Sequence, residues 1–475
     1  MFDKFREECG VFGVLGRADA ANLVYLGLYA LQHRGQESAG IAAVNGDGKI
    51  ISEKEMGYVA DVFTHERLSR LPGDTAIGHV RYSTAGGSML CNAQPIVAST
   101  SKGAIAVAHN GNLTNGDELR KQLEAEGAIF NSTADSEVIV HLIARSKASD
   151  LEGAFIDALA RVQGAYAIAL LAPGRIFAAR DPYGFRPLVL GKLDDVHAVS
   201  SETCAFDLIG AETVREIGAG EIVAIEHEGV RVVRQARAER EARCIFEHVY
   251  FARPDSVVFG NSVADVRQRF GAQLAREHPV DADIVVPVPD SGVFAALGYA
   301  QEARIPFQYG LVRNHYVGRT FIEPKQTIRS FGVKVKLNPV RGLVEGKRIV
   351  LIDDSIVRGT TSKKIVRMLK DAGASEVHMR ISSPPTSWPC YYGIDTPERT
   401  QLIGSSHSTE EIRAFIEADS LGYLSEDGLL EAVRNSDDPR ALYCTACFSG
   451  DYLKPAAPRA EAVPAADAEA VTAAV

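Results

Sequence analysis

The chain has 475 residues, more than one hydrophobic core usually organises, so we expect two domains. Hydrophobic residues make up 46% of it and charged residues 24%, and no stretch reaches the roughly 18 unbroken apolar residues of a membrane span. A formal net charge of -10 argues against a dedicated nucleic-acid binder, because neutralising phosphates needs a concentrated basic face. We therefore expect small-molecule substrates, and neither a membrane nor a nucleic acid as partner.

The seven cysteines lack close pairing, apart from Cys444 and Cys447, which is unlike the framework of a secreted disulfide domain. This pattern predicts a reducing, cytoplasmic location. The first eight residues, MFDKFREE, are charged and have no apolar segment of the kind that secretory signals carry.

Glycine-bounded apolar runs fill the first half of the chain and are typical of strands. They are Cys9–Leu15, Ser38–Val44, Thr75–Ser83, Gly103–Ala108, Ala165–Ala172, Arg175–Ala179 and Glu221–Ile225. Helical periodicity covers Ala20–Gln32, Asp117–Glu126, Asp135–Arg145 and Leu151–Val162, with Asp135 and Asp150 as expected N-caps. Many strands with few helices indicate stacked sheets flanked by helices.

A charged segment, Arg231–Arg243, interrupts this pattern and is the expected domain junction. After it, strands and helices alternate, which favours a parallel sheet with crossover helices. The expected helices are Ser262–Glu277, Val293–Ala303 and Thr361–Ala372, and the expected strands are Ile284–Pro287, Phe307–Val312, Arg348–Ile352 and Glu376–Ile381. Residues 454–475, mostly Ala, Pro and Glu, are expected to form a disordered tail.

The run VLIDDSIVRGTTS (Val350–Ser362) combines an apolar strand, two carboxylates and a helix start. In open α/β sheets, ligands bind at the carboxyl ends of the strands. Gly359, Thr360 and Thr361 offer donors to a phosphate, and Asp353 and Asp354 can hold ribose hydroxyls or Mg²⁺. The alternative is an ordinary surface turn with a capped helix, but paired aspartates after an apolar strand are costly without a ligand.

This run resembles the phosphoribosyl-pyrophosphate motif of the type I phosphoribosyltransferases. The loop Val286–Gly292, VPVPDSG, resembles the pyrophosphate loop of that family, although alone it could be a Pro/Gly turn. Arg313–Pro324 resembles the flexible lid, and a solvated basic loop is the alternative. The resemblance implies that the substrate is bound by Asp353, Asp354, Ser355, Arg358, Gly359, Thr360, Thr361, Asp290, Ser291, Gly292, Tyr316 and Arg319, with Ser291, Asp353 and Asp354 holding Mg²⁺.

Cys9 opens an apolar strand, where a cysteine is more often a buried small hydrophobe than a nucleophile. Four later segments change this interpretation: LQHRGQESAG from Leu31, GHVRYSTAG from Gly78, HNGNL from His109 and TADSE from Thr133. Together they resemble the N-terminal-nucleophile glutamine amidotransferases. In that chemistry the α-amino group of the nucleophilic cysteine moves the proton, so residues 1–8 are expected to be a propeptide that is removed.

The same resemblance implies the roles of the other glutaminase residues. We expect the Asn110 side chain and the Gly111 N–H to stabilise the oxyanion of the tetrahedral intermediate. Arg81 is expected to bind the glutamine α-carboxylate and Asp135 its ammonium group. The alternative is that Arg81 and Asp135 form a structural pair. His109 is expected to be structural.

Cys244, Cys390, Cys444 and Cys447 all lie at or beyond the junction. Four thiolates suit an iron–sulfur cluster or a structural zinc, and the spacing alone leaves the metal open. The flanking sequences, CIFEHVYFARPDS and YCTACFSG, resemble an enzyme subclass that carries a [4Fe–4S] cluster. Such a cluster would fasten the carboxyl end of the second domain to its start. Cys91 and Cys204 are expected to be ordinary thiols.

From Cys9 to about Tyr452 the chain resembles the iron–sulfur amidophosphoribosyltransferases. This implies an N-terminal-nucleophile αββα glutaminase domain (9–238) followed by a type I phosphoribosyltransferase domain with a parallel sheet (239–453), an α+β and α/β combination. It also implies Mg²⁺ and [4Fe–4S] cofactors, glutamine and phosphoribosyl pyrophosphate as substrates, purine nucleotides as inhibitors, and a homotetramer.

Three other functions remain as alternatives. The glutaminase half could feed a sugar isomerase or an asparagine-forming synthetase, but the DDSIVRGTTS motif argues against both. A nucleotide-sensing regulator of gene expression is the third, and the acidic balance and the glutaminase motifs argue against it.

Overall fold

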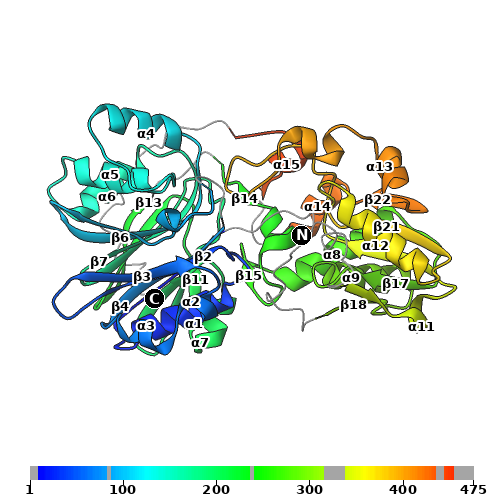
Figure 1. Cartoon of the computed structure of the whole chain (residues 1–475), viewed down its shortest axis with the longest axis horizontal. Helices are drawn as coiled ribbons and strands as arrows, with labels where there is room; N and C mark the ends of the chain where they lie inside the picture. The colour runs from blue at the N-terminus through cyan, green and yellow to red at the C-terminus, as the bar shows by residue number, and fades with distance from the viewer. Residues whose placement is uncertain (1–8, 83–86, 236–239, 315–336, 435–442, 454–475) are drawn as a thin grey trace, which may run out of the picture.

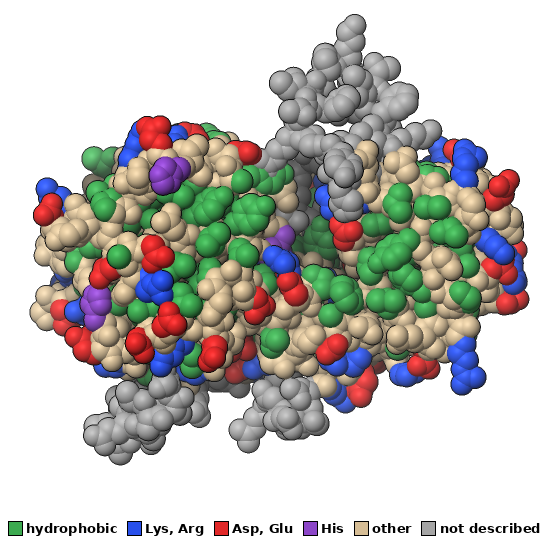
Figure 2. Space-filling model, turned by 90° about the horizontal axis from the view of Figure 1, so that it is seen from below, with side chains coloured by type: hydrophobic (Ala, Val, Ile, Leu, Met, Phe, Trp, Pro, Cys, Tyr) green, Lys and Arg blue, Asp and Glu red, His purple; other side chains and the backbone are tan. Residues whose placement is uncertain are grey.

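The computed structural model describes residues 9–82, 87–235, 240–314, 337–434 and 443–453. These residues form two lobes side by side, the first from the part of the chain before residue 236 and the second from the part after residue 239 (Figure 1). The space-filling view shows a hollow where the lobes meet (Figure 2). Every helix within the described ranges is too short or too polar to cross a bilayer.

The first lobe contains two antiparallel sheets. One has seven strands, in the order β11 (Glu212–Glu216), β9 (Val189–Leu193), β10 (Val196–Ser200), β1 (Gly10–Leu15), β4 (Thr75–Arg81), β2 (Ser38–Val44) and β3 (Ile50–Met56). The other has six, in the order β13 (Gly229–Gln235), β12 (Glu221–Glu226), β8 (Arg175–Arg180), β7 (Gly164–Ala172), β6 (Gly103–Leu113) and β5 (Ile96–Thr100). β1 lies inside its sheet, between β10 and β4.

Three buried apolar clusters show that this lobe has four layers. One lies between the sheets and includes Val11 and Ala169, and each of the others lies between a sheet and its helices. The helices over the seven-stranded sheet are α1 (Ala20–Ala30), α2 (Val59–Val62), α3 (His65–Ser69) and α7 (Cys204–Ile209). Those over the six-stranded sheet are α4 (Gly116–Ala125), α5 (Glu137–Arg145) and α6 (Leu151–Leu159). The expected αββα arrangement is confirmed.

The second lobe is built on a parallel sheet of four strands, in the order β17 (Ile284–Pro287), β20 (Arg348–Asp353), β21 (Glu376–Ile381) and β22 (Ser420–Tyr423). Alternate residues of β20 point to opposite faces: Val350 and Ile352 pack with helices α8 (Val263–Glu277) and α9 (Val293–Ala303). Ile349 and Leu351 pack with α12 (Thr360–Asp371) and α13 (Thr409–Ile416). Both faces are therefore covered by helices, as a parallel sheet requires.

Shorter elements complete the structure. In the second lobe they are β14 (Arg243–Cys244), the π-helical turn η2 (Glu247–Phe251), β15 (Val257–Val258), β16 (Asn261–Ser262), β18 (Leu311–Arg313), β19 (Leu337–Pro339), α11 (Arg341–Val344), η4 (Arg399–Gln401), η5 (Ile403–Ser405), α14 (Glu426–Val433), β23 (Tyr443–Cys444) and α15 (Ala446–Ser449). In the first lobe there is one such turn among the described residues, η1 (Leu90–Asn92).

Two local expectations were wrong. The strand expected at Phe307–Val312 is broken: Phe307 makes an isolated bridge to Val285, and β18 then pairs with β19. Asp150 caps α6 by accepting a hydrogen bond from Gly153 N, as predicted, but α5 begins one residue after Ser136 rather than at Asp135. The Asp135 carboxylate instead accepts a hydrogen bond from Leu113 N, at the end of β6.

The crossing of α8 and α9 provides a test of this packing. A Cβ added at Gly271 would lie 1.8 Å from the carbonyl oxygen of Ala295, whereas one added at Gly46 would have no heavy atom within 4 Å. We expect Gly271→Ala to destabilise the second lobe by about 1–3 kcal/mol or more, because the helix backbones would have to separate. Gly46→Ala should stay within about 0.5 kcal/mol of the parent. Equal thermal unfolding midpoints for the two variants, followed by circular dichroism, would contradict this.

Candidate functional site

Cys9 immediately precedes β1 and lies beside the end of β4. Gly10 pairs with Val80, and the Cys9 thiol donates a hydrogen bond to the Tyr82 carbonyl oxygen at 3.5 Å. The side chain is buried, with 7% of the residue exposed. Burial raises the pKa of the thiol to about 11, although the nearby charge of Arg81 acts in the opposite direction. A thiol in this place needs a base to become a nucleophile at neutral pH.

Arg81 and Asp135 lie close enough to Cys9 for their charges to affect its pKa. Arg81 is buried, donates a hydrogen bond to the Gly87 carbonyl oxygen at 3.0 Å and forms an ion pair with Glu37 at 3.7 Å. Asp135 accepts hydrogen bonds from Leu113 N at 2.8 Å and from Ser136 Oγ at 3.2 Å. A cation and an anion thus lie near the thiol, and such charges can pair with the carboxylate and the ammonium group of an amino acid.

Asn110 and Gly111 lie on β6. This strand was expected to end at Ala108, but it continues for five more residues, to Leu113. The Asn110 Nδ2 atom is buried and has no hydrogen-bond partner among the described residues. An unsatisfied buried donor costs about 1–3 kcal/mol, so a group that accepts a hydrogen bond from it would be favoured. Gly111 has φ +146°, and a Cβ there would lie 2.0 Å from the Ala165 carbonyl oxygen, so the position requires glycine.

Two buried histidines, one on each sheet, form a hydrogen bond that connects the two sheets. His79 Nε2 on β4 lies 3.0 Å from the carbonyl oxygen of His109 on β6. His109 is itself bonded to Ser136 Oγ at 2.9 Å through Nδ1. These bonds agree with the structural role expected for His109.

In the second lobe, the loops after β17 and β20 meet at one edge of the sheet. Ser291 Oγ donates a hydrogen bond to Asp353 Oδ1 at 3.2 Å, and both Asp353 and Asp354 are almost fully buried. A Cβ at Gly292 would lie 2.3 Å from the Ile352 carbonyl oxygen, which explains the glycine between the loops. The neighbouring Ser355 hydroxyl donates to Asp354 Oδ2.

Other residues expected at this site are also near it. Asp290 is exposed and paired with Arg313 Nη1 at 2.9 Å. Arg358 is exposed and donates a hydrogen bond to Gln401 at 2.7 Å, and α12 begins after Gly359, with Thr360 exposed and Thr361 buried. Tyr316 and Arg319 lie outside the described residues.

A cavity of about 430 Å³ lies beside these loops and is shared by both lobes. The second lobe contributes Tyr250–Pro254, Arg267, Val288–Ser291, Arg313 and Leu337. The first lobe contributes His33 and Gln36, which belong to the glutaminase-like motif LQHRGQESAG and had no expected role. The segment HRGQ could have indicated that these residues are functional. Their contact with the second lobe could not be predicted, because it exists only when the two domains are docked. A larger cavity, of about 530 Å³, lies against β6 and includes Asp135, Tyr183 and Tyr391 in its lining.

The four later cysteines lie close enough to influence one another, where the start and the end of the second lobe meet. Cys244 pairs with Cys444 in the parallel β14–β23 bridge. Burial raises the pKa of the Cys447 thiol well above its ordinary value, and the neighbouring thiols of Cys444, Cys244 and Cys390 raise it further. Cys204 is buried elsewhere and Cys91 is exposed. Within the described ranges, no three His, Cys, Asp or Glu side chains are arranged to hold one metal ion.

Comparisons with known proteins agree with both halves of this description. A family model for a glutamine amidotransferase domain matches residues 79–207, and one for a phosphoribosyl transferase domain matches residues 262–382. The chain is 54% identical to Amidophosphoribosyltransferase 2, chloroplastic, of Arabidopsis thaliana over 455 residues, 95% of this chain and 81% of the relative. It is 49% identical to the amidophosphoribosyltransferase of Bacillus subtilis over 448 residues, 94% of each chain.

A solved structure agrees as well. The B. subtilis glutamine phosphoribosylpyrophosphate amidotransferase complexed with ADP and GMP has a TM-score of 0.88 and 48% sequence identity, with 94% of this chain and 97% of that chain covered. A glutaminase-like sandwich with a buried cysteine is thus followed by a phosphoribosyltransferase sheet, in a chain about half identical to its relatives over nearly its whole length. The chain belongs to the amidophosphoribosyltransferase family.

Proposed function

We propose that this enzyme hydrolyses glutamine at Cys9 and adds the ammonia to 5-phosphoribosyl 1-pyrophosphate, giving 5-phosphoribosylamine, glutamate and pyrophosphate. The observation that carries the proposal is the cavity beside Ser291, because residues of the glutaminase lobe, His33 and Gln36, form part of its wall. A site shared in this way lets a nitrogen made in one lobe react in the other. The reaction is the first committed step of purine synthesis.

In the first half-reaction, the Cys9 sulfur attacks the glutamine carboxamide. Removal of Met1–Glu8 gives Cys9 a free α-amino group, which takes the thiol proton and passes it to the departing ammonia. The raised thiol pKa supports this role, since the thiol cannot ionise alone at neutral pH. Water then hydrolyses the thioester to glutamate and regenerates the thiol.

Four groups bind glutamine and its intermediate. The Asn110 Nδ2 and the Gly111 N–H donate to the oxyanion, and the unpartnered, buried amide of Asn110 supports this assignment. Arg81 binds the α-carboxylate and Asp135 the ammonium group, and the effect of both charges on the pKa of Cys9 supports their nearness to it.

In the second half-reaction, ammonia attacks carbon 1 of the ribose and pyrophosphate leaves. Asp353 and Asp354 hold the ribose hydroxyls, and with Ser291 they offer the oxygen ligands that Mg²⁺ prefers. Bound there, Mg²⁺ would neutralise charge on the departing pyrophosphate. The 5-phosphate is bound by Ser355, Arg358, Gly359, Thr360 and Thr361, and the pyrophosphate by Asp290, Ser291 and Gly292. Tyr316 and Arg319, which are also assigned to binding of this substrate, lie outside the described residues.

The cysteines Cys244, Cys390, Cys444 and Cys447 suit a [4Fe–4S] cluster. Their mutual electrostatic influence supports a common site, and the donor set is all thiolate. Zinc would draw four sulfurs to about 2.3 Å from one ion, whereas a four-iron cluster holds its cysteines farther apart. We prefer the cluster to zinc because the sequences that flank these cysteines resemble the iron–sulfur subclass of this enzyme family. Its role is to fasten residues 443–453 to the start of the domain.

We propose domain limits of 9–238 and 239–453, a cytoplasmic location and a homotetramer. The tail expected at 454–475 lies outside the described residues. Purine nucleotides are proposed as inhibitors, and the ADP and GMP of the B. subtilis relative support nucleotide binding in this family.

The division of labour can be tested by Cys9→Ala. Glutamine-dependent release of pyrophosphate from phosphoribosyl pyrophosphate should be abolished, while ammonia-dependent release should be retained, because the transferase site lies in the other lobe. Cys204→Ala, which removes another buried thiol of the same lobe, is the control and should keep both activities. Equal loss of both activities in Cys9→Ala would contradict the proposal, as would an active enzyme whose intact mass retains residues 1–8.

The pH dependence of glutamine hydrolysis tests the base. If the α-amine accepts the proton, kcat should rise with pH until the amine is neutral, at about 7.7–8.0, and then level off. If the thiol instead had to ionise alone, its pKa of about 11 would make the rate increase about tenfold per pH unit well beyond pH 9. Enzyme preincubated at each pH and returned to pH 8 gives the control for irreversible inactivation.

The cluster is tested by anaerobic purification followed by iron and acid-labile sulfide assays. We expect about four of each per chain, falling strongly in Cys447→Ser but not in Cys91→Ser, whose thiol is exposed and belongs to the first lobe. Loss of the cluster should lower the thermal midpoint of the second lobe. Zinc in place of iron, or a midpoint unaffected by complete cluster loss, would count against the assignment.

A further inference from the structure

A buried arginine connects the Cys9 backbone to the second lobe. The Arg34 side chain is fully buried, and its Nε donates a hydrogen bond to the Cys9 carbonyl oxygen at 3.1 Å. Its two terminal nitrogens bind Glu247 of the second lobe, Nη1 to Oε2 at 3.0 Å and Nη2 to Oε1 at 2.7 Å. One planar guanidinium therefore touches the nucleophile on one side and the phosphoribosyltransferase lobe on the other.

The charges around Arg34 are balanced across the lobe boundary. Glu202, also fully buried, accepts a second bond from Arg34 Nη1, and His33 Nε2 lies 2.7 Å from it. Burial pushes the pKa of Glu202 upwards, but His33 and Arg34 hold it well below its ordinary value. Arg186 lies 3.5 Å from Glu247 and donates to the Tyr392 carbonyl oxygen at 2.6 Å. Each of these buried carboxylates thus lies in an ion pair with a buried guanidinium.

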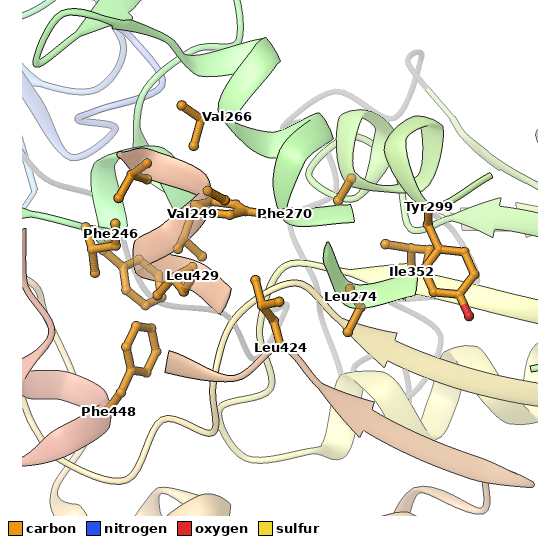
Figure 3. Packing of buried hydrophobic residues seen from close by; sticks show 14 of the residues in the cluster. Phe246, Val249, Val266, Phe270, Leu274, Tyr299, Ile352, Leu424, Leu429 and Phe448 are labelled. Carbon is orange, nitrogen blue, oxygen red and sulfur yellow. The ribbon is translucent and has the colours of Figure 1, made fainter. Parts of the chain in front are cut away.

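Glu247 is held in a fixed place. It begins η2, and Phe246 and Val249 on either side of it pack into the core of the second lobe with Phe448 and Phe270 (Figure 3). The same turn continues to Tyr250 and Phe251, which line the cavity beside Ser291. The carboxylate that binds Arg34 thus lies in the same helical turn as the residues that line the proposed phosphoribosyl pyrophosphate site.

We propose that Glu247 is a positioning residue for the glutaminase nucleophile, acting through Arg34 on the Cys9 carbonyl. The inference rests on the proposed function. Once residues 1–8 are removed, Cys9 has no peptide bond on its amino side, so the direction of its amine and thiol depends on the hydrogen bond that its carbonyl makes. A displaced nucleophile reacts slowly even where substrate binding is unchanged, because a misplacement of about 1 Å can cost about 100-fold. The glutaminase centre is therefore complete only when the two lobes are docked.

A purely structural role is the alternative. Buried ion pairs are weak evidence for stability, whereas removal of one partner is strongly destabilising because it leaves an unpaired charge. Such a role would lower the stability of the whole enzyme and both of its activities. A positioning role would lower kcat for glutamine hydrolysis and leave ammonia-dependent synthesis intact.

The test compares Glu247→Gln with Glu221→Gln in the full-length holoenzyme. Glu221 is a matched control: it is buried, holds Arg215 through both oxygens at 2.7 and 2.8 Å, and lies within the first lobe away from Cys9. For Glu247→Gln we expect kcat for glutamine hydrolysis to fall about 10- to 100-fold with KM within about threefold, and ammonia-dependent synthesis within about twofold of the parent. Glu221→Gln should keep all of these values.

Arg34→Lys decides the matter if Glu247→Gln does not fold. A lysine keeps the buried cation but cannot bond the carbonyl and both carboxylates together, so the same selective fall in kcat is expected. Intact-mass measurement confirms that each variant has lost residues 1–8. Unchanged glutamine hydrolysis in a folded variant, or equal loss of glutamine- and ammonia-dependent synthesis, would overturn the inference. Since the parent enzyme is assayed beside the variants, failure of the proposed function would be seen there first.

Discussion

The pairing of β1 with β4 determines the geometry of the first active centre. It places the start of one strand, Cys9, beside the end of the other, Arg81, at the same rim of a buried sheet. The position has a chemical cost, because removing the thiol from water raises its pKa to about 11. In the proposed function a nucleophile buried so deeply needs a base next to it, and the amine of the same cysteine would be a base that needs no additional space.

The second centre depends on a different constraint. Parallel strands end at one edge of a sheet, so the loops after β17 and β20 meet even though about sixty residues separate them in the chain. Their approach is close enough that Gly292 lies against the backbone of Ile352. Ser291 and Asp353 are thereby joined, and Ser291 also lines the cavity that both lobes share.

Much of this arrangement can be predicted from sequence, because it follows from local patterns. The β20 motif, its two aspartates and the helix beginning after Gly359 are contiguous, and the parallel sheet follows from alternating apolar runs. Features that depend on pairing partners could not be predicted. β6 was expected to stop at Ala108, since the polar residues from His109 to Asn112 break the apolar run; in the structure they pair with β7 up to Leu113. Edge strand β3 was missed for the same reason, as its charged residues are only half-buried.

The contact between the lobes was the least predictable part, and its physics explains why. Arg34, Glu202 and Glu247 are separated by many residues, and each alone would be costly to bury. Only the docked lobes bring them together, where each charge meets an opposite one and the guanidinium donors are used on three sides. Apolar side chains would fill the same space at lower cost, but they would not bond the Cys9 carbonyl. We therefore explain the buried charges at this boundary by the orientation that Arg34 gives to the carbonyl group of Cys9.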